Sequence, residues 1–161
     1  MPVAYIALGA NLGDPPRQLR TALQQLAQLP QTRLLVASNL YRSAPLGPSA
    51  QAYYCNAVCS VDTRLAPAAL LALMLELERT AGRVRSAERW GPRTLDLDLI
   101  HVEGVTSDAA ALRLPHPELS RRNFVLVPLA EIAPTLKIPG LGNVELAAHR
   151  IGSDGLAPWP E

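Results

Sequence analysis

Two aspartates separated by one leucine are the residues of this sequence best suited to chemistry. Asp96 and Asp98 lie in the run Leu95-Asp96-Leu97-Asp98-Leu99, and a period of two is typical of a β-strand with one buried face. The two carboxylates then point to one face, with their residues roughly 6.5 to 7 Å apart along the strand. Carboxylates placed together repel each other, and a hard divalent cation such as Mg²⁺, which prefers oxygen ligands, removes that repulsion. An amphipathic strand whose acids simply face water has the same pattern.

A group of arginines precedes these acids and supplies positive charge for an anion. It is opposed between residues 79 and 93 only by Glu88 and consists of Arg79, Arg83, Arg85, Arg89 and Arg93. A guanidinium group holds phosphate oxygens in pairs, although G+C-rich coding would also enrich arginine in a chain whose sole lysine is Lys137. The stiff, turn-forming Trp90-Gly91-Pro92 separates the arginines from the strand. This combination favours a metal-assisted phosphate site over a merely solvated surface.

The composition indicates one globular domain over residues 1–161. With 48% hydrophobic residues and a formal charge of +1, the chain can bury a core and has no global attraction to nucleic acid or to anionic membranes. Its most apolar stretch, residues 65–77, is too short to span a bilayer. Cys55 and Cys59 would lie roughly 13 Å apart in a strand, too far for a disulfide, and free, buried thiols fit a reducing cytoplasm. We therefore expect a soluble, cytoplasmic protein that binds neither nucleic acid nor membrane. We also expect it to be a monomer.

The order of the predicted elements indicates an α+β fold. Apolar periodicity predicts strands over residues 3–8, 33–41, 53–63 and 95–102, and helices over residues 15–28 and 67–82. This is the β-α-β-β-α-β order of a ferredoxin-like sandwich, in which two helices cover one face of a four-stranded antiparallel sheet. The other face would be free to bind a ligand. C-terminal appendages follow: a short strand over 112–114, a helix over 124–132 broken near Pro128, and an irregular extension over 137–161.

Several other residues carry a weaker chemical signal. Tyr54 and Asn56 would share one face of their strand, where a ring beside an amide suits a flat heterocycle. A surface tyrosine and a satisfied asparagine are equally compatible with this pattern. Glu78 stands in the last turn of its helix, where the helix dipole disfavours an acid. Arg122 begins a predicted helix, and a helix N-terminus welcomes an anion.

The stretch R-W-G-P-R-T-L-D-L-D-L-I, residues 89–100, closely resembles the signature of the 6-hydroxymethyl-7,8-dihydropterin pyrophosphokinase family of folate biosynthesis. The resemblance extends through residues 4–12, 41–48, 82–85 and 128–134 and covers a core of about 3–136. It implies transfer of the β,γ-pyrophosphoryl group of ATP to the hydroxymethyl oxygen of a reduced pterin, with release of AMP and with two Mg²⁺ ions. Asp96 and Asp98 would hold both metals, Arg83 and Arg93 would neutralise the developing charge, and Arg85 would assist closure.

The resemblance also assigns the substrate contacts. It places ATP against Glu78, Arg85, Trp90, Arg93, Leu99, His116 and Arg122. It places the pterin between the rings of Tyr54 and Phe124, with further contacts from Ser43, Ala44, Pro45, Leu46, Asn56, Trp90 and Asp96. Ala111 departs from the family pattern, because a basic ATP contact can occur there, and Arg113 on the same strand face is a substitute.

Two other classes of function remain open from the residues alone. A metal-dependent phosphohydrolase or nuclease would also use paired aspartates and arginines, and release of phosphate without an acceptor would identify it. A ferredoxin-like module that binds RNA or a small molecule is the non-enzymatic alternative. One Phe, two Trp, four Tyr and a charge of +1 are a weak basis for RNA binding.

Overall fold

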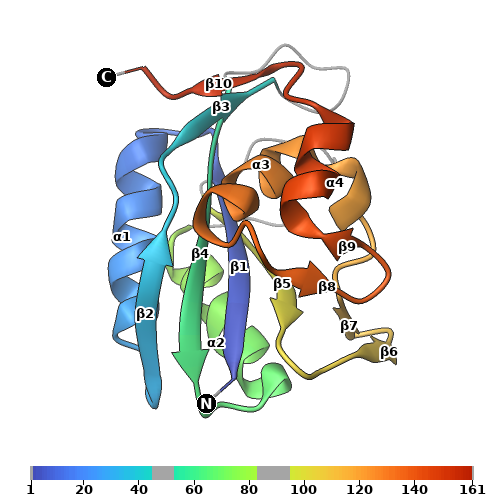
Figure 1. Cartoon of the computed structure of the whole chain (residues 1–161). Coiled ribbons are helices and arrows are strands. Elements are labelled where there is room, and N and C mark those ends of the chain that lie inside the picture. Colours follow the sequence, from blue (N-terminus) through green and yellow to red (C-terminus); the bar gives the residue numbers. More distant parts are fainter. Residues whose placement is uncertain (1, 45–52, 83–94, 161) are drawn as a thin grey trace.

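The computed structural model describes residues 2–44, 53–82 and 95–160. Its centre is a six-stranded antiparallel sheet in the order β10-β3-β4-β1-β5, with β2 also paired to β4 (Figure 1). The strands are β1 (Val3–Ala10), β2 (Thr32–Ala37), β3 (Tyr41–Ser43), β4 (Tyr54–Thr63), β5 (Asp96–Val102) and β10 (Leu156–Pro158). The mixed α/β class and the antiparallel sheet are as predicted, but the sheet has two more strands than expected.

One of the extra strands arises because the predicted strand over 33–41 divides into β2 and β3. Ser38 interrupts it, since its hydroxyl donates to Asn39 O at 2.8 Å and accepts from Val58 N at 3.0 Å. Asn39 N then donates to the Glu131 carboxylate at 3.0 Å rather than to a neighbouring strand. Short polar side chains compete in this way with the hydrogen bonds of a sheet.

Two helices cover one face of the sheet, as expected. In α1 (Pro15–Ala27) the buried residues Leu19, Ala22 and Leu26 form one stripe, and the Asp14 side chain caps the helix by accepting from Arg17 N. The second helix, α2 (Pro67–Thr80), packs in the same core cluster. That cluster includes the apolar side of β5 and the free, buried thiols Cys55 and Cys59.

The opposite face is covered as well, so the expectation of a second face free for ligand is wrong over much of its area (Figure 1). There α3 (Asn123–Ile132) and α4 (Val144–Ile151) pack on the sheet residues Tyr5, Ala7, Val58 and Ile100. The expected break near Pro128 is also absent from α3, which continues through it. Proline removes one helical hydrogen bond, but Pro128 lies among buried apolar side chains that hold the helix on the sheet.

The C-terminal residues are ordered elements, and the prediction of an irregular extension over 137–161 is wrong. A hairpin of β8 (Lys137–Ile138) and β9 (Gly142–Asn143) leads into α4, which Asn143 caps by accepting from Leu146 N at 2.8 Å. The chain then returns to pair β10 with β3. Upstream, β6 (Ser107–Ala109) pairs with the expected short strand β7 (Leu112–Leu114), and the 3-10 turn η1 (Leu119–Arg121) precedes α3. In the described residues no helix has the length and apolar character needed to cross a membrane.

Candidate functional site

Three central strands bring an amide and a carboxylate onto one row of the sheet. Gly9 of β1 is paired with Asn56 of β4 on one side and with Asp96 of β5 on the other. A Cβ added to Gly9 would lie 3.7 Å from Asn56 Oδ1, so glycine leaves the backbone bare between the two polar groups. In the next row on the same face, Ala7 lies between Val58 and Asp98. The small residues Ala7 and Gly9 of β1 thus form a floor between β4 and β5.

The two aspartates of β5 share one face, as the alternation predicts. Leu97 and Leu99 are each 4% exposed and lie in the core toward α1 and α2, whereas Asp96 and Asp98 are only partly buried. The structure places Arg122 Nη1 3.5 Å from Asp98 Oδ2, with the two side chains 23% and 33% exposed. One guanidinium therefore lies beside the acid pair, from an element 24 residues further along the chain.

Glu78 supports the same strand from behind. Its side chain is 2% exposed, and Oε2 accepts a 2.7 Å hydrogen bond from Leu97 N. Leu97 separates the two aspartates, so this bond fixes the backbone that carries them. The contact gives a structural reason for an acid in the last turn of α2, where the dipole disfavours one.

His116 lies close to the charges of the site. Burial lowers the pKa of His116 first, the positive charge of Arg122 lowers it further, and Glu118 and Asp96 oppose the shift. Its Nδ1 accepts from Glu118 N at 3.1 Å, and its backbone N–H donates to Ile100 O at 2.8 Å. A neutral imidazole whose Nδ1 accepts carries its proton on Nε2, which is left as the donor.

A second group of polar residues lies along β3 and the start of β4. Asn56 Nδ2 donates to Ser43 Oγ at 2.7 Å, and both side chains are buried. Tyr54 is half-buried and is paired with Ser43 in the register, and it shares the face of Asn56 because the two lie two residues apart on β4. Tyr41 begins β3, and its hydroxyl donates to Glu131 of α3 at 2.5 Å. Burial and the Glu131 carboxylate raise the pKa of Tyr41 to about 12.

Phe124 stands at the start of α3 beside Arg122, whose guanidinium carbon is 5.9 Å from the centre of its ring. Because α3 packs across β3 and β4, its first turn and the polar row of the sheet belong to the same face. The contacts that Tyr41 and Glu131 make were missed at the sequence level, because a hydrogen bond between residues 90 positions apart leaves no local pattern.

The predicted site residues divide into three sets. The first set lies on the sheet face that α3 and α4 cover and consists of Ser43, Tyr54, Asn56, Asp96, Asp98, Arg122 and Phe124. The second set is described by the structure but lies beside or behind that face: Ala44 directly follows β3, His116 is near the charges of Arg122 and Asp96, and Glu78 and Leu99 lie in the core on the opposite side of the sheet. The third set lies outside the described residues and consists of the predicted contacts Pro45, Leu46, Arg83, Arg85, Trp90 and Arg93.

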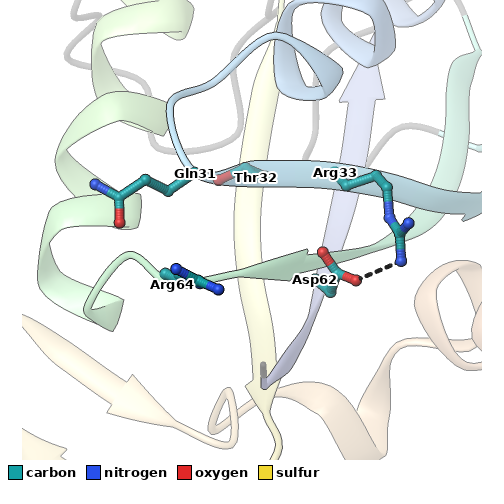
Figure 2. A pocket seen from close by; sticks show the side chains of 5 residues that line it. All are labelled: Gln31, Thr32, Arg33, Asp62 and Arg64. Carbon is teal, nitrogen blue, oxygen red and sulfur yellow. Dashed lines mark hydrogen bonds and ion pairs between the residues drawn. The ribbon is translucent and has the colours of Figure 1, made fainter.

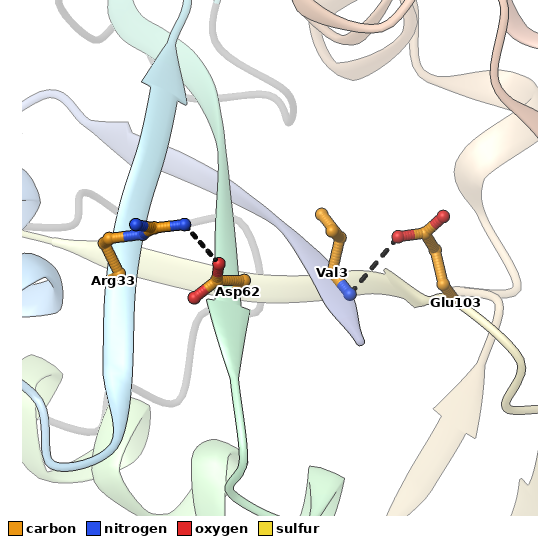
Figure 3. A network of polar contacts seen from close by, with 4 residues as sticks. All are labelled: Val3, Arg33, Asp62 and Glu103. Atoms are coloured by element: carbon orange, nitrogen blue, oxygen red, sulfur yellow. Dashed lines mark hydrogen bonds and ion pairs between the residues drawn. The ribbon is translucent and has the colours of Figure 1, made fainter. Parts of the chain in front are cut away.

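A separate hollow of about 400 Å³ lies at the other end of the sheet (Figure 2). It is lined by Gln31, Thr32, Arg33, Asp62 and Arg64. Its carboxylate is already paired, since Asp62 Oδ2 lies 2.9 Å from Arg33 Nη2. Figure 3 shows this pair in one row with Val3, whose N–H donates to Glu103. A lone, neutralised carboxylate does not suit a metal, so the acid pair of β5 is the better candidate.

A family model and individual relatives of this chain point to the same family of enzymes. The model of the family described as 7,8-dihydro-6-hydroxymethylpterin-pyrophosphokinase (HPPK) matches residues 5–134. The 2-amino-4-hydroxy-6-hydroxymethyldihydropteridine pyrophosphokinase of Pseudomonas aeruginosa is 47% identical over 135 residues, covering 84% of this chain and 83% of that protein. The protein of the same name from Bacillus subtilis is 41% identical over 159 residues, covering 99% and 91%.

Solved structures resemble the fold at low sequence identity. The Plasmodium falciparum HPPK-DHPS structure with pteroate aligns with a TM-score of 0.72 and 12% identity over 92% of this chain. This chain spans 42% of that longer protein. At this identity the likeness concerns the fold alone.

Proposed function

The chain belongs to the 7,8-dihydro-6-hydroxymethylpterin-pyrophosphokinase family, and we propose on that premise that it transfers pyrophosphate from ATP to 6-hydroxymethyl-7,8-dihydropterin. The products are the pterin diphosphate and AMP, and the reaction belongs to folate biosynthesis. The observation that carries the residue assignments is the row that joins Asn56, Gly9 and Asp96, with Asp98 and Arg122 beside it.

Asp96 and Asp98 are the proposed magnesium ligands. They offer oxygen donors on one face, they are partly exposed, and a guanidinium lies close enough to bind the phosphates that accompany the metal. Two protein carboxylates suit Mg²⁺, which keeps waters and takes phosphate oxygens in its other positions. Bound Mg²⁺, two ions by family resemblance, would polarise the phosphoryl oxygens and the acceptor hydroxyl.

The arginines are proposed to bind and neutralise the phosphates. Arg122 is partly buried, and its 3.5 Å distance from Asp98 leaves its donors available to a phosphate oxygen. By family resemblance Arg83 and Arg93 would counter the charge on the transferred group, with Arg85 assisting. Transfer of this kind depends on positioning and charge rather than on a covalent intermediate, so these roles need no nucleophile from the protein.

The pterin is proposed to lie over the β1 floor between Tyr54 and Phe124. The Asn56 Nδ2 group donates one hydrogen bond to Ser43. Its Oδ1 lies over Gly9, where it can accept a hydrogen bond from the polar edge of the pterin. Asp96 in the same row would then lie toward the hydroxymethyl group. The remaining pterin contacts are proposed for Ala44, Pro45, Leu46 and Trp90.

ATP is proposed to lie on the Arg122 side of the acid pair. His116 would donate from Nε2, because its lowered pKa favours the neutral imidazole and its Nδ1 already accepts from Glu118 N. Arg113 is the substitute for the basic contact absent at Ala111. Glu78 and Leu99 stay assigned to ATP as a proposal, with Leu99 contributing backbone atoms because its side chain is buried.

We also propose that β1, α1, β2, β4, α2 and β5 follow the ferredoxin-like plan, and that the protein acts as a cytoplasmic monomer. The antiparallel order of β2, β4, β1 and β5 supports the first of these proposals.

Product analysis tests the function directly. The protein is incubated with ATP, Mg²⁺ and 6-hydroxymethyl-7,8-dihydropterin, and the nucleotides are separated. AMP that forms only when the pterin is present establishes pyrophosphoryl transfer. ADP and phosphate formed without the pterin would instead identify a hydrolase.

A further inference from the structure

We propose that Asn123 is a positioning residue for the pterin site, and that it acts by binding the C-terminal segment to the start of α3. This segment, residues 152–159, is called the C-terminal strap below. The proposal rests on the pterin site proposed above, since Asn123 lies between the two site residues Arg122 and Phe124.

The first turn of α3 makes a side-chain contact with a segment outside the helix. Arg122 is the residue at the N-cap position, and its side chain makes no capping hydrogen bond. Asn123, the next residue, sends its side chain away from the helix, and Nδ2 donates to the backbone carbonyl of Asp154 at 2.9 Å. The position of this turn sets where the Arg122 guanidinium and the Phe124 ring lie.

The same strap is fixed to the other wall of the site. Two residues beyond Asp154, β10 begins, and its register pairs Leu156 with Ser43 and Pro158 with Tyr41. Trp159 N adds a 2.9 Å hydrogen bond to Leu40 O. Ser43 is the residue that accepts from the Asn56 amide. A short span of backbone therefore connects β3, whose Ser43 accepts from Asn56, to the helix turn that carries Phe124.

The other end of α3 has its own attachment. Glu131, in the last turn, accepts from Tyr41 at 2.5 Å and from Asn39 N at 3.0 Å. Loss of the Asn123 contact thus removes one polar attachment of the first turn, while the buried Val125 and Leu126 and the Glu131 contacts keep α3 on the sheet. The expected result is a folded protein in which the Phe124 ring is displaced, rather than an unfolded one.

Asn123→Ala removes the donor and leaves the strap sequence intact. We expect the KM for the pterin to rise between about twofold and about tenfold, the range that corresponds to one neutral hydrogen bond, with kcat changed by less than about twofold. Calorimetric titration with the pterin and a non-hydrolysable ATP analogue should give the same loss of affinity. Asn123→Gln, which keeps the amide, should recover most of it.

Two control variants separate positioning from stability. Asp154→Ala retains the carbonyl that accepts the bond, so its pterin KM should equal that of the wild type. Asn143→Asp removes an equivalent asparagine contact, from Nδ2 to Pro134 O at 3.1 Å, and keeps the cap of α4. It should lower the melting temperature about as much as Asn123→Ala does and leave the KM unchanged.

An unchanged pterin KM in Asn123→Ala, with or without a lower melting temperature, would overturn the proposal. A rise of equal size in Asp154→Ala would overturn it too, because the side chain rather than the carbonyl would then be responsible. Failure of the wild-type protein to form AMP is a different outcome and would refute the proposed function itself.

Discussion

Replacement of Asp98 by asparagine separates the chemistry of the site from the stability of the sheet. Asp98 is one third exposed and lies 3.5 Å from a partly exposed guanidinium, and ion pairs of this kind contribute about 0 to 1 kcal/mol to stability. Asparagine has nearly the same shape, so the free energy of unfolding should change by less than about 1 kcal/mol. The fold is expected to survive.

The effect on turnover should be much larger. A metal ion supplies several kcal/mol of charge stabilisation in the transition state, and each 1.4 kcal/mol or so corresponds to a factor of ten in rate. Loss of one of two carboxylate ligands is therefore expected to lower kcat by about 10²- to 10⁴-fold. The assay measures AMP formation at saturating ATP and pterin over a range of Mg²⁺ concentrations, with the melting temperature recorded for each variant.

Asp62→Asn is the matched control. It makes the same chemical change, also removes a carboxylate from an arginine, and lies at the far end of the sheet. Its turnover should equal that of the wild type. Near-normal turnover of Asp98→Asn in saturating Mg²⁺, or an equal loss in Asp62→Asn, would refute the metal assignment.

Three further predictions address protons, metal and strand support. Lowering the pH from about 7 to about 5 should reduce the free energy of unfolding, because burial lowers the pKa of His101 and His116 and the unfolded chain then binds protons that the folded chain does not. Denaturant titrations should give this slope, and His101→Phe should reduce it; an unchanged slope would contradict the assignment. Chelation of divalent ions should abolish AMP formation with no change in melting temperature, and added Mg²⁺ should restore it; AMP formed in excess chelator would argue against a metal role. Glu78→Leu, which leaves Leu97 N–H without its acceptor, should lower the free energy of unfolding by about 1 to 3 kcal/mol, and Glu78→Gln by less; equal losses would show that the acceptor is not the cause.

The parts of the fold that local patterns could predict are those that obey a single period. Alternation placed Asp96 and Asp98 opposite Leu97, and the register confirms that face. The apolar stripe and the Asp14 cap likewise predicted α1 within one residue at its C-terminal end. Burial of one side is a strong constraint, because a shift of one residue would expose every apolar side chain.

The errors occurred where contacts distant in sequence decide the structure. β10 has three residues and pairs with a β3 of equal length more than a hundred positions earlier, and three residues carry no readable alternation. Pro128 predicts a break, yet the packing of α3 on the sheet outweighs the missing hydrogen bond. For the site, the contact between Arg122 and Asp98 is likewise set by the docking of α3, which no local pattern describes.

The two buried cysteines of β4 can report how often that strand opens transiently to water. Burial raises the pKa of Cys55 and of Cys59 to about 12, so at neutral pH both are thiols, whereas the thiolate is the form that reacts with disulfide reagents. Modification then requires a transient opening that exposes the strand to water, and its rate measures how often that opening occurs. Cys55 is the chain neighbour of Asn56, so a molecule seated over Asn56 should slow its labelling without touching the sulfur. A colorimetric titration of these two native thiols therefore follows the motions of the proposed pterin floor, with no cysteine introduced by mutation.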